Sequence, residues 1–217
     1  MTINTRSKII EIGKKLAASQ LIVGTWGNVS CRSIDENKVI ITPSGVDYDR
    51  LEAADLPAVS LTSGEIEGKL KPSSELPLHV AIYRSRPEVN AIVHTHSTYG
   101  TCCAVLRQPI PPLVEDVAMV VGGTVEVAEY YLPGTEELAK ATVKALGDKN
   151  AVLLANHGVV GVGHNIDEAL KACLLTEKAA QIFITVMNVG QPFQLSSEDV
   201  HKMREVYLTS YGQKGGE

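Results

Sequence analysis

Two histidines one residue apart, His94 and His96, are the residues whose types and spacing most clearly indicate chemistry. They end a short aliphatic run typical of a β-strand, in which alternate side chains point to the same face. Two imidazoles on one face can bind one metal ion, although such a pair alone fits two unrelated histidines equally well. His157 ends a second aliphatic run, and the missing side chain of Gly158 permits close approach of a ligand or backbone. The sequence therefore predicts a divalent metal on His94, His96 and His157, and the absence of cysteine ligands favours a catalytic site.

A polar segment before a helix-like run supplies the second set of candidates. Ser73, Ser74 and Glu75 precede an apolar-periodic run from Leu76 to Tyr83, so we expect a helix with a serine N-cap. Free amides at a helix start attract anions, which indicates a phosphate cradle without lysine; a plain N-cap is the alternative. Glu75, beside a cation and partly withdrawn from water, is the predicted general acid/base. The alternative for Glu75 is an acidic residue that only favours the helix dipole.

Other polar residues give weaker signals. Two glycine-containing polar turns can add donors for a phosphate: Gly27-Asn28 and Ser44-Gly45. The remaining histidines have no partner at ligand spacing, and we expect solvated or packing roles for them: His79, His164 and His201.

Helices and short strands must position these residues. Periodicity and turn signals predict helices near residues 5–20, from 76 to before Pro87, after Ser97, after Thr135, over 167–189 and over 197–208. They predict strands near residues 38–42, 90–96 and 151–157, and a hairpin of 58–61 with 65–68 closed by a two-residue Ser63-Gly64 turn. Irregular alternation with hairpins indicates an α/β fold with a mixed sheet rather than a parallel βαβ array. No linker divides residues 1–217, so we expect a single domain.

Composition excludes several classes of protein. The formal net charge is -5 and the basic residues are scattered, so the footprint of a nucleic-acid-binding protein is missing. No apolar run approaches the roughly 20 residues of a membrane span. The four cysteines form no metal-binding or redox spacing, and no secretory signal is recognisable, so we expect a cytoplasmic protein with reduced thiols.

Five ordered motifs carry a resemblance to a known family: residues 27–30 (GNVS), 41–45 (ITPSG), 71–75 (KPSSE), 93–96 (VHTH) and 156–158 (NHG). Together they resemble the class II aldolase/adducin family, particularly its L-fuculose-1-phosphate aldolase branch, over nearly the whole chain. The resemblance implies a three-layer α/β/α domain that binds one divalent cation per subunit, zinc with manganese or cobalt as alternatives. It also implies a homotetramer with active sites between subunits.

The resemblance further implies roles for individual residues. The phosphate of a small phosphorylated sugar would be bound by Gly27, Asn28, Ser44, Gly45, Ser73 and Ser74. Glu75 would be the acid/base and also touch the metal, and Tyr211 would reach an active site. That branch has a tyrosine before the Gly122-Gly123 break that acts as proton donor across the subunit interface, whereas this chain has Glu115 and Asp116 there. Tyr211, Glu115 and Asp116 are therefore the candidates for the group that exchanges a proton with the aldehyde oxygen.

The resemblance implies metal-dependent cleavage of a ketose 1-phosphate, of the fuculose, ribulose or deoxyribulose type, to dihydroxyacetone phosphate and a short aldehyde. The metal would act as a Lewis acid on the ketose oxygens while Glu75 exchanges a proton with carbon. Relatives leave other reactions open: 4-epimerisation, decarboxylation of 3-keto sugar-acid phosphates and dehydration of methylthioribulose phosphate. A non-catalytic, adducin-like assembly module is the alternative of another class.

Overall fold

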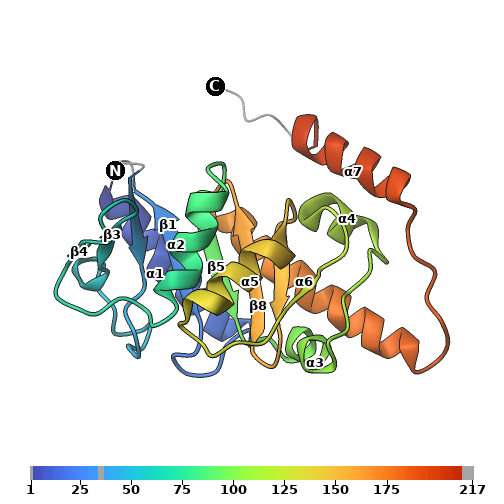
Figure 1. Cartoon of the computed structure of the whole chain (residues 1–217), viewed down its shortest axis with the longest axis horizontal. Helices are drawn as coiled ribbons and strands as arrows, with labels where there is room; N and C mark the ends of the chain where they lie inside the picture. Colours follow the sequence, from blue (N-terminus) through green and yellow to red (C-terminus); the bar gives the residue numbers. More distant parts are fainter. Residues whose placement is uncertain (1, 34–36, 212–217) are drawn as a thin grey trace.

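One mixed sheet organises the chain in the computed structural model, which describes residues 2–33 and 37–211 (Figure 1). Its strands are β1 (Asn28–Arg32), β2 (Lys38–Ile41), β3 (Ala58–Ser60), β4 (Ile66–Glu67), β5 (Ala91–Thr95), β6 (Val127–Ala128), β7 (Ala151–Leu154) and β8 (Gly158–Gly163). Their order is β4-β3-β2-β1-β5-β8-β7-β6. All neighbours are antiparallel except β6 and β7, which are parallel.

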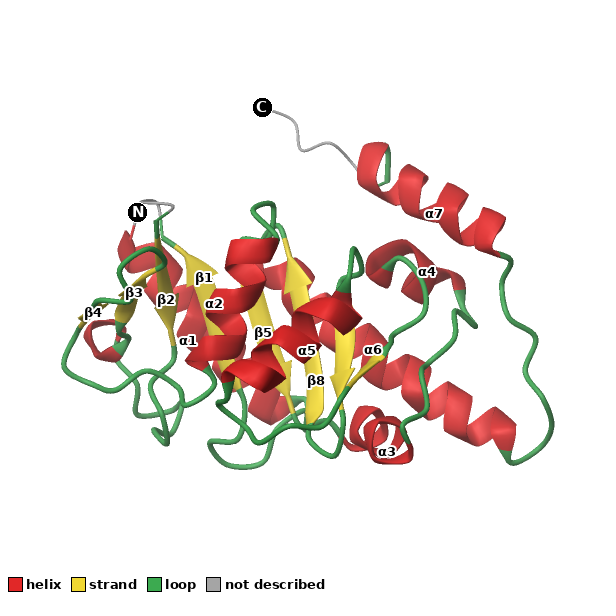
Figure 2. Cartoon of the chain, in the orientation of Figure 1, coloured by secondary structure: helices red, strands yellow, loops and turns green. Residues whose placement is uncertain are grey.

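Helices cover both faces of the sheet (Figure 2). They are α1 (Thr2–Ala18), α2 (Leu76–Ser85), α3 (Thr98–Leu106), α4 (Glu115–Val121), α5 (Glu136–Leu146), α6 (Ile166–Met187) and α7 (Ser197–Thr209), with a 3-10 turn at Ala53–Asp55. Side chains of α1 and α6 pack on one face, and α3 and α4 extend that layer. Side chains of α2 and α5 pack on the other. The predicted three-layer α/β/α arrangement with a mixed sheet is confirmed.

The central strand β5 shows how the layers orient the site. Ala91 and Val93 pack toward α1 and α6, whereas Ile92 packs toward α2 and α5. Because side chains alternate along a strand, His94 faces the same layer as Ile92, where α2 begins. The N-terminus of α2 and the end of β5 therefore meet at one place.

The sequence analysis did not predict strand β8 or helix α4. Strand β8 contains three glycines in six residues, and a Cβ at Gly161 would lie 2.7 Å from the carbonyl oxygen of Ala169. Glycine is thus required for α6 to lie close to β8, although it weakens the sequence pattern of a strand. Helix α4 is only seven residues long and rich in valine, which has a low helix propensity.

One predicted turn is wrong. Strands β3 and β4 do pair, Val59 with Ile66, but residues 61–65 connect them rather than a two-residue turn. The backbone N–H of Ser60 donates to the carbonyl of Glu65 at 2.9 Å, which closes the wider loop. None of the helices in the described residues is long and apolar enough to cross a membrane.

Candidate active site

The side chains of His94, His96 and His157 converge with that of Glu75. Nε2 of His94 lies 3.0 Å from Nε2 of His96 and 3.0 Å from Oε2 of Glu75. Oε1 of the same carboxylate lies 3.3 Å from Nε2 of His157. One ligand atom from each of the four residues lies within 4.8 Å of the others, and no other such group of His, Cys, Asp or Glu occurs among the described residues.

His94 is fully buried, and a hydrogen bond to a backbone carbonyl of β8 determines which ring nitrogen faces the cluster. Nδ1 lies 3.0 Å from the carbonyl oxygen of Val159, which can only accept, so Nδ1 carries a proton and Nε2 faces the cluster. Burial lowers the pKa of His94, but attraction and hydrogen bonding to Glu75 outweigh burial and raise it. In contrast, burial and repulsion from His94 lower the pKa of His96 to about 3 and that of His157 to about 4. Glu75 therefore gives the cluster a negative charge, which a bound cation could balance.

His157 lies in the tight turn between β7 and β8 rather than at the end of a strand as predicted. Its N–H donates to the carbonyl of Leu154 at 3.0 Å, and Asn156 before it adopts a left-handed φ of 56°. A Cβ on Gly158 would lie 2.1 Å from the carbonyl oxygen of Thr95. The predicted close approach at Gly158 is therefore confirmed, and it brings the turn against β5.

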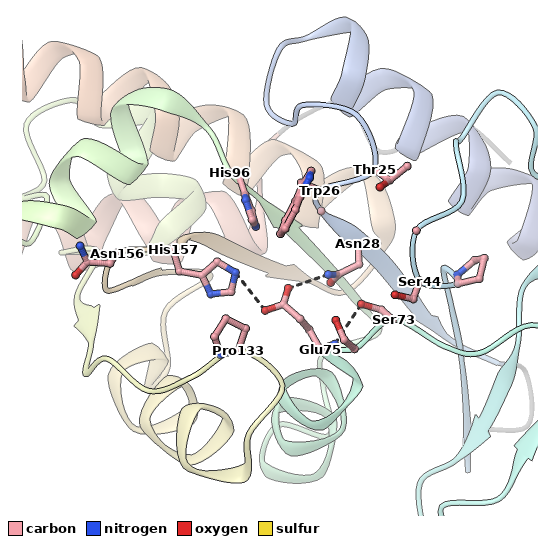
Figure 3. Close-up of a pocket in the computed structure, with 14 residues that line it drawn as sticks. Thr25, Trp26, Asn28, Ser44, Ser73, Glu75, His96, Pro133, Asn156 and His157 are labelled. Atoms are coloured by element: carbon pink, nitrogen blue, oxygen red, sulfur yellow. Dashed lines mark hydrogen bonds and ion pairs between the residues drawn. The ribbon is translucent and has the colours of Figure 1, made fainter.

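Glu75 occupies the N-cap position of α2, so the predicted serine N-cap is wrong. The reason is local: the Ser73 hydroxyl accepts from the Glu75 N–H at 3.3 Å, while the Ser73 N–H donates to the carbonyl of Thr42 at 3.0 Å. The Asn28 side chain donates to Oε2 of Glu75 at 2.9 Å (Figure 3). Burial raises the pKa of Glu75, but His94, His157 and the Asn28 hydrogen bond together bring it far below its usual value. Glu75 is therefore ionised at neutral pH.

This donor set fits a divalent metal. Two ligands on one tetrahedral zinc ion lie about 3.3 Å apart, close to the 3.0–3.3 Å separations in the cluster. Two buried polar atoms of the cluster, Oε1 of Glu75 and Nδ1 of His157, have no hydrogen-bond partner among the described residues. Buried unsatisfied oxygen and nitrogen atoms are costly, and a bound cation or ligand would satisfy the carboxylate.

The candidate phosphate residues line the same pocket of about 450 Å³ as Glu75, His96 and His157. We call Gly27, Asn28, Ser44, Gly45, Ser73 and Ser74 the cradle. Among the described residues, the backbone N–H groups of Gly45 and Ser74 and the hydroxyls of Ser44 and Ser74 make no hydrogen bond. In the described part of the chain, no lysine or arginine lines this pocket. The cradle thus offers neutral donors, as the sequence predicts, and Glu75 separates it from the histidines (Figure 3).

Three other candidates lie outside this pocket. Tyr211 follows the exposed helix α7, is 65% exposed and has its ring centroid 5.4 Å from that of Tyr207. Glu115 and Asp116 begin α4, and Asp116 forms an ion pair with Lys178. Within one chain, therefore, none of these three candidates for proton exchange with the aldehyde oxygen lines the pocket.

The sequence analysis missed several residues of the site. Trp26 is 68% exposed at the pocket, with its ring centroid 6.0 Å from that of His96, and Thr25, Pro133 and Asn156 also line the wall. His79, for which a solvated or packing role was expected, is fully buried, and its hydrogen bonds to Asn28 and Ser30 were not predicted. Its position four residues after Glu75, on the same helix face, was the signal that could have found it.

Comparison with known proteins places this geometry in a family. The sequence matches the Class II Aldolase and Adducin N-terminal domain over residues 7–184, most of the chain. The chain belongs to this family. Members of the class II aldolases use a divalent metal, and the cluster of Glu75 with the three histidines is where this chain could bind one.

Relatives of this chain are named for different activities. A 5-deoxy-D-ribulose 1-phosphate aldolase of Bacillus thuringiensis serovar kurstaki is 36% identical over 209 residues, 96% of this chain and 97% of the relative. A solved L-fuculose 1-phosphate aldolase is 36% identical with a TM-score of 0.91, covering 94% of this chain and 96% of that one. A 3-oxo-tetronate 4-phosphate decarboxylase of Haemophilus influenzae is 34% identical over 183 residues, 82% of this chain and 86% of the relative. The family thus includes more than one reaction.

Proposed function

We propose that this class II aldolase family member cleaves a ketose 1-phosphate to dihydroxyacetone phosphate and a short aldehyde. The observation that carries this proposal is one pocket with two chemically distinct sides. One side holds the Glu75 carboxylate with His96 and His157, behind which His94 is buried, and the other holds neutral hydrogen-bond donors suited to a phosphate. Relatives named as aldolases for 5-deoxyribulose and fuculose phosphates support this substrate class.

The chain's own residues would divide the work. His94, His96 and His157 would hold the cation, with Glu75 as a further ligand until substrate binds. The cation, probed first as zinc with manganese or cobalt as alternatives, would supply Lewis-acid polarisation of the ketose oxygens. The cradle would fix the phosphate and so place the carbon next to the ketone beside Glu75.

Glu75 would then move the proton at that carbon. In the condensation direction its carboxylate takes the proton from dihydroxyacetone phosphate, and in the cleavage direction it returns the proton to the same carbon. Cleavage also requires a base for the hydroxyl that becomes the aldehyde oxygen. Because Tyr211 lies outside the pocket of its own chain, we assign this role to Tyr211 of a neighbouring subunit, with Glu115 and Asp116 as alternatives.

In a homotetramer with active sites at its subunit interfaces, Tyr211 of one subunit would reach the pocket of the next. Apolar residues beside the pocket support a covering subunit, because Trp26, Val105 and Leu106 are 68%, 50% and 70% exposed. Mixing inactive Glu75→Gln subunits with Tyr211→Phe subunits tests whether Tyr211 acts in the active site of a neighbouring subunit. Recovery of activity in the hybrid oligomers supports this arrangement, whereas no recovery contradicts it.

Decarboxylation of a 3-keto-acid phosphate is the second candidate, supported by the Haemophilus influenzae relative and by the need for the same metal and cradle. Incubating metal-loaded protein with 5-deoxyribulose, fuculose, ribulose and rhamnulose 1-phosphates and assaying dihydroxyacetone phosphate separates the two. We expect this product from at least one substrate. Its absence from all four, together with carbon dioxide release from a 3-keto-acid phosphate, would overturn the aldolase proposal.

A further inference from the structure

A line of buried polar side chains runs between β1 and α2, behind Glu75. Asn28 and Ser30 occupy alternate positions of β1 and so share a face, while Glu75, His79 and Tyr83 recur every four residues along α2. We call these five residues the seam. None is more than 6% exposed, and α2 otherwise contributes apolar side chains to the core.

Four hydrogen bonds join the seam end to end. Nδ2 of Asn28 is 2.9 Å from Oε2 of Glu75, and Oδ1 of Asn28 is 2.5 Å from Nε2 of His79. Nδ1 of His79 is 2.7 Å from the Ser30 hydroxyl, which is 2.9 Å from the Tyr83 hydroxyl. Each member therefore touches the next, and Tyr83 lies at the end remote from the pocket.

The direction of every donor follows from Glu75. An ionised carboxylate only accepts, so Nδ2 of Asn28 donates to it and Oδ1 of Asn28 must accept from Nε2–H of His79. Burial lowers the pKa of His79 to about 3, so the ring is neutral and its Nδ1 accepts from Ser30. The Ser30 oxygen then accepts from Tyr83. The reverse orientation of the Asn28 amide would set two acceptors against each other at Glu75.

We propose that His79 is a positioning residue that, through the side-chain amide of Asn28, fixes Oε2 of Glu75 beside His94 and leaves Oε1, on the His157 side, for the substrate. Oε1 is the carboxylate oxygen that has no hydrogen-bond donor among the described residues. Both polar atoms of Asn28 are engaged in the seam, so only its second Nδ2–H is available to a bound phosphate. The inference rests on the proposed role of Glu75 in proton transfer.

Two substitutions at His79 separate positioning from simple packing. The amide nitrogen of Gln can replace Nε2 and keep a donor to Asn28, whereas Asn reaches only the place of Nδ1 and loses that donor. We expect His79→Asn to lower kcat about 10- to 100-fold and to weaken zinc binding about tenfold, with KM nearly unchanged. His79→Gln should keep kcat within about threefold of the wild type, although both variants lose similar thermal stability.

Controls keep the experiment decisive. Thr142→Val removes another fully buried hydroxyl, which bonds to the carbonyl of Leu138 in α5, and should lower stability without changing kcat. If His79→Asn fails to fold, Ser30→Ala should lower kcat more than Tyr83→Phe, because Ser30 contacts His79 directly. Equal loss of kcat in both His79 variants in proportion to stability, or unchanged kcat in both, would overturn the proposal.

A readout independent of the reaction distinguishes failure of this inference from failure of the proposed function. The ¹⁵N chemical shifts of His79 in labelled wild-type protein should show a neutral ring protonated at Nε2. A ring protonated at Nδ1 alone, or at both nitrogens at pH 7, would contradict the hydrogen-bond directions assigned to the seam and overturn the proposal. If that tautomer is found but no ketose phosphate is cleaved, the proposed function fails, and zinc affinities of the two His79 variants still test the positioning of Glu75.

Discussion

The two sides of the pocket are built in opposite ways. The metal side, formed by His94, His96, His157 and Glu75, is largely buried, and hydrogen bonds to β8 and β1 hold the side chains of His94 and Glu75 in place. The cradle is more open, and Ser44 and Ser74 have exposed side chains without hydrogen-bond partners among the described residues. A buried site with convergent lone pairs suits a resident cation, whereas open neutral donors suit an anion that enters and leaves.

The largest effect should follow from removing a metal ligand. His96→Ala leaves the hydrogen bond from His94 to Val159 intact but removes one of three imidazoles, so we expect loss of bound metal and of all measurable cleavage. Metal analysis of the purified variant and the dihydroxyacetone phosphate assay check both. His201→Ala, which alters an exposed histidine on α7, is the matched control. Full activity in metal-free His96→Ala would contradict the assignment of the histidine side of the pocket to a catalytic metal.

The second effect concerns the carboxylate between the two sides. We expect Glu75→Gln to keep the metal while kcat falls at least about 100-fold, because the amide cannot exchange a proton. Metal content and kcat of the variant are measured beside those of Glu65→Gln, an exposed site in the β3–β4 connection. Wild-type turnover in Glu75→Gln would remove its assignment as acid/base.

A smaller effect belongs to the cradle. Ser74→Ala removes one free hydroxyl donor, so we expect kcat/KM for a ketose 1-phosphate to fall about tenfold, mostly through KM, with metal content unchanged. Ser63→Ala on the exposed β3–β4 connection should change neither constant. Loss of metal in Ser74→Ala, with KM unchanged, would contradict separate roles for the two sides of the pocket in binding metal and phosphate.

The smallest effect is on stability against pH. The pKa of His79 is lowered by burial to about 3, below the value near 6.5 of an exposed histidine, so the unfolded chain binds this proton first as pH falls. The contribution to stability is complete above pH 6.5 and is lost toward pH 3. Urea unfolding of chelator-stripped protein at pH 7, 6 and 5 should show a steeper decline for the wild type than for His79→Gln, by at most about 1.4 kcal/mol per pH unit. Parallel declines would contradict a neutral, buried His79.

Local patterns in the sequence were enough for part of this site. His94 and His96 converge because a strand has a period of two, and the close approach at Gly158 follows from its missing side chain. The hydrogen bond between Asn28 and Glu75 joins residues 47 positions apart and depends on how β1 and α2 pack. No spacing in one sequence encodes that contact, and the same limit hid the partners of His79.

The fold shows a similar division. Long amphipathic segments such as α6 were predicted nearly to their ends, since periodicity and the Asn165 cap are local. Strand β8 was not predicted because its glycines are required by the close packing of α6. The N-cap of α2 is Glu75 rather than a serine because the Ser73 hydroxyl accepts a hydrogen bond from the Glu75 N–H. Tertiary contacts therefore decide the features that local patterns leave open.

Activity measured while metal is returned to stripped protein tests the central claim most directly. Zinc, manganese or cobalt titrated into chelator-treated wild-type protein should restore dihydroxyacetone phosphate release from a ketose 1-phosphate. Activity should reach its maximum at one metal ion per chain, and His157→Ala protein should not respond. Cleavage that proceeds equally without metal, or that none of these metals restores, would contradict a catalytic metal centre on His94, His96, His157 and Glu75.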